Sequence, residues 1–241
     1  MDPVSSRHKI SVMSYNLLFN NKSKGQAIEV IEKENADVVM VQEMTHEWHE
    51  KLLGAFKLKY PYRYLYPDRG VRGLGVFSKY PMSKKCYVFS DNRKPLAQVV
   101  DLNLNGTNLS LANVHFASPA VALENPDNFL TLYLENNKKR TGQWSRLHNE
   151  LKNNWGTDVV IAGDFNTMPI EPLYQEITSD YVDADHDWVW WRSATFPNVA
   201  DKTAILPLDY FFLQGELAVD EFEVIEGGSS DHFAIKAVLT Y

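Results

Sequence analysis

The sequence predicts an α+β fold in which two β-sheets pack face to face and helices cover their outer faces. Short runs with strand character recur along the whole chain and outnumber the helical patterns. Hairpin turns dominate the middle, and no glycine-rich phosphate loop follows the first predicted strand, which argues against a doubly wound Rossmann sheet. With 241 residues the chain is long enough for one large buried core. We therefore expect a single domain over residues 1–241, with residues 1–8 flexible.

The N-terminal quarter alternates strands with helices. The residues at 9–15 alternate as they do in a strand, and a continuous apolar run at 38–41 predicts a second, buried strand. A helix between them is expected to begin after Ser23, a residue type that caps helix N-termini. Apolar residues at helical spacing mark this helix and the next one: Ala27, Ile28, Val30 and Ile31, then Trp48, Leu52, Leu53 and Phe56.

The periodicity then changes to that of strands. Gly, Pro and Asn turns separate the segments, and Asn105-Gly106 is a good hairpin signal because both residues tolerate positive φ. One further long helix is expected from the spacing of Trp144, Leu147, Leu151 and Trp155. The remaining predicted strands cover residues 62–66, 74–78, 86–89, 96–104, 108–114, 159–162, 208–213, 218–224 and 234–239.

Two stretches fit neither pattern and are predicted to be long loops. Residues 117–140 are polar and contain two prolines, and residues 183–201 contain Trp188, Trp190 and Trp191. Long loops beside strand ends often select the substrate. Base stacking, contact with a membrane interface and a structural aromatic cluster all remain open for these tryptophans.

The charge and cysteine content narrow the function classes. The formal net charge of −7 argues against a processive binder of duplex DNA but not against a nuclease with a local basic cleft. The single cysteine, Cys86, excludes an internal disulfide, and its apolar neighbours predict a buried structural thiol. No run has the length of a membrane span, so we expect no stable membrane insertion and a cytoplasmic monomer. A chain trimmed of a signal or anchor has the same composition.

Polar side chains recur where the predicted apolar strands end. Taken singly, such a residue is more often a solvated or turn-capping group than part of a site. The strand ends of one sandwich can converge on a single rim, however, and a functional site needs such convergence. The residues in question are Asn16, Gln42, Glu43, Asn113, His115, Gly163, Asp164, Asn166, Asp209, Ser230, Asp231 and His232.

The carboxylates in this set predict a metal site. Brought together, Glu43, Asp164, Asp209 and Asp231 raise one another's pKa unless a cation relieves the repulsion. Oxygen ligands of carboxylate and amide character suit Mg²⁺, with Mn²⁺ as a substitute. Zinc is disfavoured because the chain has no cluster of Cys and His ligands at zinc-motif spacing.

Six motifs resemble, in order, those of the endonuclease/exonuclease/phosphatase superfamily, and together they span nearly the whole chain. Gly-Asp-Phe-Asn and Ser-Asp-His are specific in combination, whereas the Gln-Glu pair and the first Asn are weak signals alone. The resemblance implies a four-layered αββα sandwich of two mixed, mostly antiparallel sheets flanked by helices, as in pancreatic-type deoxyribonucleases, and a bacterial-type member. The motifs are Ser14-Tyr15-Asn16-Leu17-Leu18, Val41-Gln42-Glu43, Asn113-Val114-His115, residues 161–169, Leu208-Asp209-Tyr210 and Ser230-Asp231-His232.

The resemblance also implies roles for the matching residues. On the metal side, Glu43 is the main Mg²⁺ ligand, Asn16 completes the shell and Asp231 sits beside the ion. On the catalytic side, Asp164 orients and deprotonates the attacking water. Asn166 holds Asp164 or a phosphate oxygen, and His115 donates to a phosphate oxygen. His232 contacts the scissile phosphate, and Asp209 fixes the tautomer of His232. His232 as the base is an alternative that the sequence leaves open.

The substrate is left open between two classes. The first is nucleic acid, cleaved by a nuclease or an end-processing phosphodiesterase, and we favour it as the commoner activity of the superfamily. The second is a lipid headgroup or small phosphate ester, as in sphingomyelinases. The segment Phe165-Asn166-Thr167 departs from the pattern of inositol phosphatases and argues against that subfamily. A non-catalytic binding module is disfavoured because no key residue is lost.

Basic residues give only weak guidance on the substrate. Lys138, Lys139 and Arg140 form either a solvated helix start or a contact to a phosphate backbone. A second group either supplies positive potential near the rim or consists of loop charges: Arg69, Arg72 and Lys79.

Overall fold

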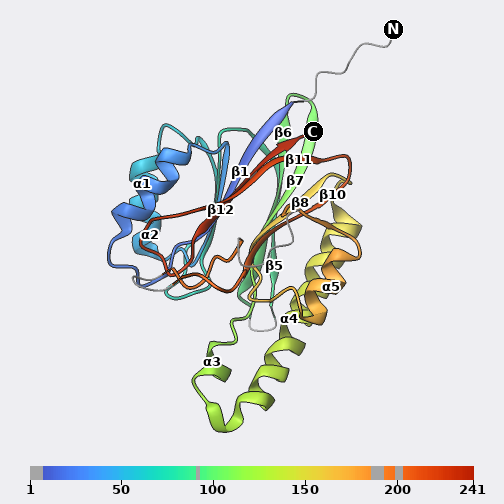
Figure 1. The fold of residues 1–241 in the computed structure, drawn as a ribbon. Coiled ribbons are helices and arrows are strands. Elements are labelled where there is room, and N and C mark those ends of the chain that lie inside the picture. Colours follow the sequence, from blue (N-terminus) through green and yellow to red (C-terminus); the bar gives the residue numbers. More distant parts are fainter. Residues whose placement is uncertain (1–7, 91–92, 186–192, 199–202) are drawn as a thin grey trace.

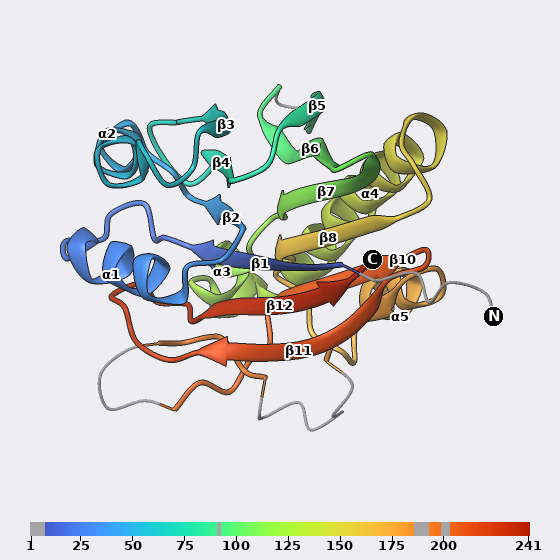
Figure 2. The same ribbon diagram turned by 90° about the horizontal axis from the view of Figure 1, so that it is seen from above.

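Two six-stranded sheets form the centre of the molecule, with helices on their outer faces (Figures 1 and 2). The computed structural model describes residues 8–90, 93–185, 193–198 and 203–241. The first sheet has the strand order β11-β12-β1-β2-β4-β3, and the second has the order β5-β6-β7-β8-β10-β9. Helices α1 and α2 cover the first sheet, and α4 and α5 cover the second (Figure 2). The predicted α+β sandwich is confirmed.

Most of the predicted elements lie close to their expected positions, whereas α3, η1, α5, β9 and the first turns of α4 were not predicted. The helices are α1 (Lys24–Glu34), α2 (His46–Phe56), α3 (Ala120–Leu123), the 3₁₀-helix η1 (Pro126–Asn128), α4 (Phe129–Asn154) and α5 (Pro172–Thr178). The strands of the first sheet are β1 (Lys9–Asn16), β2 (Val38–Gln42), β3 (Tyr62–Tyr66), β4 (Leu74–Ser78), β11 (Ala218–Ile225) and β12 (Ala234–Thr240). Those of the second are β5 (Met82–Phe89), β6 (Pro95–Leu104), β7 (Thr107–His115), β8 (Val159–Asp164), β9 (Val182–Asp183) and β10 (Asp209–Gln214).

Alternation along the strands produces a core in three layers. In β1, Ile10 and Val12 point into the space between the sheets, whereas Met13 and Tyr15 point under α1 and α2. The third cluster lies between the second sheet and the helices α4 and α5, where Trp144 and Leu147 pack on Phe165. The central strands are therefore apolar on both faces, which is why they appear in the sequence as continuous apolar runs.

The prediction that residues 117–140 form a long loop is wrong. This stretch is mostly helical: α3, η1 and the first turns of α4 form an arm, residues 118–136, that projects from the body (Figure 1). The two prolines begin helical segments here, since Pro119 is the N-cap of α3 and Pro126 is the first residue of η1, where no backbone N–H is needed. The arm carries several exposed apolar side chains: Val121, Leu123, Phe129, Leu130 and Leu134.

Other expectations need smaller corrections. Ser23 precedes α1 as expected, but its side chain makes no capping hydrogen bond. Lys138 to Arg140 lie inside α4 and not at a helix start, and Arg140 is fully buried. The tryptophans Trp188, Trp190 and Trp191, like most of residues 1–8, lie outside the described residues.

Cys86 is partly buried against the core, as expected for a structural thiol. Burial raises the pKa of its thiol to about 12, and the neighbouring Glu150 adds to the shift, so the thiol stays protonated and unreactive at neutral pH. Among the helices of the described ranges, none is both long enough and apolar enough to cross a bilayer.

Strand directions bring the predicted site residues to neighbouring edges of the two sheets. β1 and β2 are parallel, so Asn16 and Gln42 lie side by side at their carboxyl ends. β7 and β8 are also parallel, with His115 beside Asp164, and the antiparallel β10 places Asp209 on the other side of Asp164. Two neighbouring rims of the sandwich thus carry the polar residues that follow the apolar runs.

Candidate active site

Asp164 is the centre of the site and is almost fully buried, with 1% of its surface exposed. Its Oδ1 accepts the backbone N–H of Asn166 at 2.9 Å, and its Oδ2 accepts the side-chain amide of Asn16 at 3.1 Å. Burial raises the pKa of Asp164 to about 6, the nearby His232 opposes the shift, and Asp209 adds to it. Asp164 is therefore mostly ionised at neutral pH and is a stronger base than an ordinary carboxylate.

The backbone around Asp164 is constrained. Gly163 has φ of +145°, and a Cβ at this position would lie 2.1 Å from the carbonyl oxygen of Val114, so only glycine fits. Asn166 has φ of +51°, in the left-handed region. Its side-chain amide donates to the carbonyl of Phe116 at 3.3 Å, which ties the segment after β8 to the segment after β7.

Asp209 and His232 form a buried pair beside Asp164. His232 Nδ1 lies 2.8 Å from Asp209 Oδ2, and His232 Nε2 lies 3.9 Å from Asp164 Oδ2. Burial lowers the pKa of this imidazole, but the carboxylates of Asp209 and Asp164 outweigh burial and raise it to about 10. The ring of Phe196 packs against His232 with centroids 5.0 Å apart. His232 is therefore a fixed cation at neutral pH.

This pair predicts a pH-dependent stability. The pKa of His232 is about 10 in the folded state against an ordinary value of 6.5, so the folded protein keeps a proton that the unfolded chain loses. The stabilisation is fully present below pH 6.5 and is lost as the pH rises through about 10. We expect the free energy of unfolding in urea to fall across this window in the wild type and much less in His232→Gln. Equal slopes for the two proteins would contradict the assignment.

His115 ends β7, which neighbours β8 on the side away from β10, and its side chain also lies near Asp164. Its Nδ1 lies 2.9 Å from the carbonyl oxygen of Val71, which can only accept, so Nδ1 carries the hydrogen. Nε2 then faces the carboxylates, 3.5 Å from Asp164 Oδ2 and 3.9 Å from Glu43 Oε1. Burial is the main cause that lowers the pKa of His115. His115 is thus a mostly neutral histidine in a fixed orientation.

Glu43 faces this cluster from the other sheet. It follows β2 in the left-handed region, with φ of +59°, and its Oε2 accepts the backbone N–H of Phe19 at 2.8 Å. Burial raises the pKa of Glu43, and the carboxylate of Asp231 adds to the effect. Arg72, half-buried on the loop before β4, is close enough for its charge to interact with Glu43. A strained backbone that aims a buried carboxylate at others is typical of a functional site.

The structure brings together all the site residues predicted from the sequence. Asn16 contacts both carboxylates: its Nδ2 donates to Asp164 and, at 3.4 Å, to Glu43, whereas its Oδ1 accepts the N–H of Leu18. It therefore bridges the two carboxylates through its amide nitrogen. The backbone carbonyl of Asp231 accepts the N–H of Asn198, and its carboxylate is close enough to Glu43 to contribute to the raised pKa of that residue.

A buried amide network supports the rim from beneath. Gln42 donates to Asn113 at 2.7 Å, and Asn113 donates to Gln98 at 3.3 Å and to the carbonyls of Val41 and Gly75. These three amide residues are fully buried and join the two sheets directly below the site. Gln98 was missed in the sequence because it lies within an apolar strand, where a single amide has no local signal of function.

Comparisons with known proteins agree with this geometry. A model of the endonuclease/exonuclease/phosphatase family matches residues 13–232. No curated protein matches the chain significantly. Among solved structures, a protein of that family from Bacteroides thetaiotaomicron is 15% identical, with a TM-score of 0.74 and 98% of each chain covered.

Two further solved structures share the fold. TDP2 from D. rerio, complexed with a single strand DNA product, is 16% identical with a TM-score of 0.73, covering 97% of this chain and 99% of that one. A truncated TDP2 from Caenorhabditis elegans is 19% identical with a TM-score of 0.69, covering 97% and 98%. At such identities these likenesses concern the fold alone.

Proposed function

The chain belongs to the endonuclease/exonuclease/phosphatase family of metal-dependent phosphoric ester hydrolases, and from this premise we propose that it cleaves phosphodiester bonds of nucleic acid by in-line attack of water. The observation that carries the proposal is the environment of Asp164. A buried carboxylate with a raised pKa lies between a cationic His232 and a neutral His115. That arrangement combines a base with two groups able to contact an anionic phosphate.

The protonation states favour one assignment of the base. His232 is already protonated at neutral pH, because its pKa is about 10, so it cannot take a proton from water. Asp164, with a pKa of about 6, is ionised and can. In the proposed reaction Asp164 accepts the proton of water while the water oxygen bonds to phosphorus. The opposite P–O bond breaks, its electron pair stays on the departing oxygen, and that oxygen takes a proton from solvent. His232, oriented by Asp209, neutralises the charge that gathers on the phosphate oxygens.

The donor set fits a hard divalent cation, for which we propose Mg²⁺. Burial raises the pKa of Glu43 and the carboxylate of Asp231 raises it further, so both residues would hold a cation that relieves this repulsion. Such an ion would supply positive charge that polarises the phosphate. Asn16 would join as an oxygen ligand only after its amide turns, because in this structure the amide nitrogen faces the carboxylates.

A second possible ligand group exists among the described residues: Asp164, Asp209 and His232 have ligand atoms within 4.8 Å of one another. We prefer the group around Glu43. Asp209 Oδ2 and His232 Nδ1 are already engaged with each other at 2.8 Å, and a bound cation competes with the proton that His232 carries.

The proposal of nucleic acid as substrate is supported by a relative, since a structure of D. rerio TDP2 is described as a complex with a single strand DNA product. A lipid or small ester is the second candidate, favoured by an apolar cavity of about 330 Å³ beside the catalytic pair. Its lining includes Met168, Leu206 and Tyr210 as well as Asp209. Such a cavity suits an acyl or aromatic substituent of a phosphodiester. We propose a monomer, because all proposed site residues come from one chain.

The test is hydrolysis over one substrate panel with Mg²⁺ and with EDTA. The panel contains a chromogenic phosphodiester and its monoester, a single-stranded oligonucleotide, an abasic duplex and sphingomyelin. We expect Mg²⁺-dependent cleavage of the oligonucleotides, abolished by EDTA and restored by added Mg²⁺ or Mn²⁺. Turnover of sphingomyelin or small esters alone would support the second candidate. No turnover on any substrate, with no Mg²⁺ binding by calorimetry, would overturn the catalytic proposal.

A further inference from the structure

Helix α4 carries two polar residues on the face that packs against the second sheet. Arg140 is fully buried and Gln143 is 3% exposed, among the apolar residues Trp144, Leu147 and Leu151. Residues three positions apart lie on one side of a helix, so the two side chains leave α4 together. A guanidinium inside a core is costly unless it is paired, which raises the question of what this one does.

The two side chains hold different segments of the active site. Gln143 Oε1 accepts the backbone N–H of Ala117 at 2.9 Å, two residues after His115. Arg140 Nη2 donates to Glu171 Oε2 at 2.5 Å, and Glu171 Oε1 accepts the backbone N–H of Met168 at 3.1 Å, two residues after Asn166. One helix face thus fixes both segments that leave the parallel strands β7 and β8.

The two segments are also joined to each other at the catalytic carboxylate. The backbone N–H of Phe116 donates to the carbonyl of Asp164 at 2.9 Å, and the side chain of Asn166 donates to the carbonyl of Phe116. The backbone N–H of Asn166 holds Asp164 Oδ1. Asn166 makes this contact from a left-handed conformation, which persists only where the surroundings enforce it. Glu171, which pairs with Arg140, lies at the other end of the segment 165–171 and accepts the N–H of Met168 within it.

The Arg140–Glu171 pair is poorly suited to a purely stabilising role. Within the described ranges, Arg140 Nε and Nη1 have no hydrogen-bond partner, although both atoms are buried. An apolar pair of the same volume often stabilises a core as well as a buried ion pair does. An apolar pair, however, could not orient a carboxylate. Here the hydrogen bond from Arg140 orients Glu171 toward the N–H of Met168.

We propose that Arg140 is a positioning residue of the reaction: through Glu171 it holds the segment 165–171 so that Asn166 keeps Asp164 aimed at the attacking water. This inference rests on the proposed function, because it concerns the same carboxylate. Arg140 touches no reacting atom, and its effect reaches the chemistry through the geometry of Asn166. Misplacement of a catalytic group by about 1 Å is enough to lower turnover about 10²-fold.

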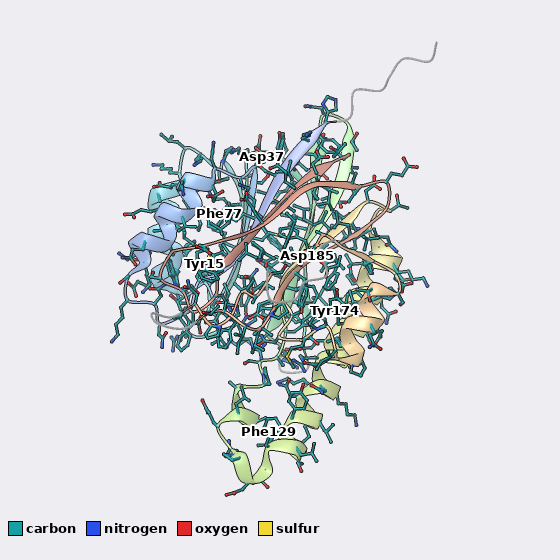
Figure 3. All side chains as sticks on the ribbon, viewed as in Figure 1. Tyr15, Asp37, Phe77, Phe129, Tyr174 and Asp185 are labelled. Carbon is teal, nitrogen blue, oxygen red and sulfur yellow. The ribbon has the colours of Figure 1, made fainter. Side chains whose placement is uncertain are left out.

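The test compares Arg140→Met with two other proteins. The first is the double variant Arg140→Met/Glu171→Met, which replaces the ion pair by an apolar pair. The second is Lys79→Met, a control that removes the half-buried pair of Lys79 with Asp37 at 3.2 Å. Asp37 lies at the end of the molecule opposite the arm residue Phe129 (Figure 3). Melting temperature, kcat and KM for the chromogenic diester, and exchange of the Asn166 amide hydrogen are measured for each.

We expect Arg140→Met to lower kcat by about 10–100-fold with little change in KM, and to speed exchange at Asn166. The double variant is expected to regain melting temperature but not kcat, and Lys79→Met to lose stability while keeping kcat and the exchange rate. Arg140→Lys should recover part of kcat, because it restores one charged donor to Glu171.

Two results would overturn the positioning role. One is a kcat of folded Arg140→Met within about twofold of the wild type. The other is recovery of both melting temperature and kcat in the double variant, which would mean that Arg140 acts only through stability. If the wild type turns over no phosphodiester, the proposed function fails, and exchange at Asn166 alone then decides whether Arg140 orders this segment.

Discussion

We expect Asp164→Asn to lower kcat for the phosphodiester by about 10²–10⁴-fold, the range for loss of a general base. The amide is nearly isosteric with the carboxylate, but it cannot take a proton from water. The surrounding donors are also mismatched, since Asp164 accepts hydrogen bonds from both Asn16 and Asn166. Burial of the carboxylate is unfavourable in the folded state, as its raised pKa shows, and its removal offsets part of this mismatch, so we expect the variant to fold.

Asp37→Asn is the matched control for this variant. Asp37 is a partly buried carboxylate that accepts hydrogen bonds from Ser11 and pairs with Lys79, away from the site. Its change to an amide should lower the melting temperature and leave kcat unaltered. Measuring single-turnover rates for both variants separates chemistry from product release. A rate for Asp164→Asn close to that of the wild type would move the role of base elsewhere in the site.

Glu43→Gln is expected to weaken Mg²⁺ binding by at least about 10–100-fold, the loss typical even of residues that only support a metal ligand. The amide removes the negative charge but keeps an oxygen able to accept the N–H of Phe19. Activity at low Mg²⁺ should fall by several orders of magnitude and recover in part as the concentration is raised. Calorimetric titration and the half-saturating Mg²⁺ concentration provide two independent measures.

Glu47→Gln serves as the control for the metal ligand. Glu47 is an exposed carboxylate on α2 that pairs with Lys24 at 3.0 Å, on the side of the molecule where Glu43 also lies. We expect its Mg²⁺ affinity and activity to match those of the wild type. If Glu43→Gln binds Mg²⁺ as the wild type does, the ion belongs instead to the group formed by Asp164, Asp209 and His232.

Much of the site could be predicted from the sequence because its residues follow strands whose apolar runs are easy to recognise. Parallel neighbours such as β1 and β2, or β7 and β8, necessarily end at the same edge of their sheet. The position of an apolar run in the sequence therefore predicts that the residue after it lies at this edge of the sheet. The hairpin at Asn105-Gly106 was predicted on other grounds, because both residues tolerate positive φ, and these positive φ values are observed.

The features that escaped prediction depend on partners distant in sequence. Gln98 belongs to the buried amide network only because Asn113, on the next strand, donates to it, and the local sequence does not show this contact. In the sequence, Arg140 stands beside two lysines and resembles a surface charge; only the structure shows that it pairs with Glu171. In the arm, the prolines suggested a loop because a proline marks both the start and the interruption of a helix, and local sequence does not say which applies.

The site draws on segments from Asn16 to His232, and this spread affects when activity can appear during synthesis. β1 lies between β2 and β12, so one edge of β1 stays unpaired until β12 has been made. A nascent chain that stops before residue 232 has the proposed base, Asp164, but lacks His232. On the proposed function, we therefore expect such unfinished chains to be inactive as hydrolases.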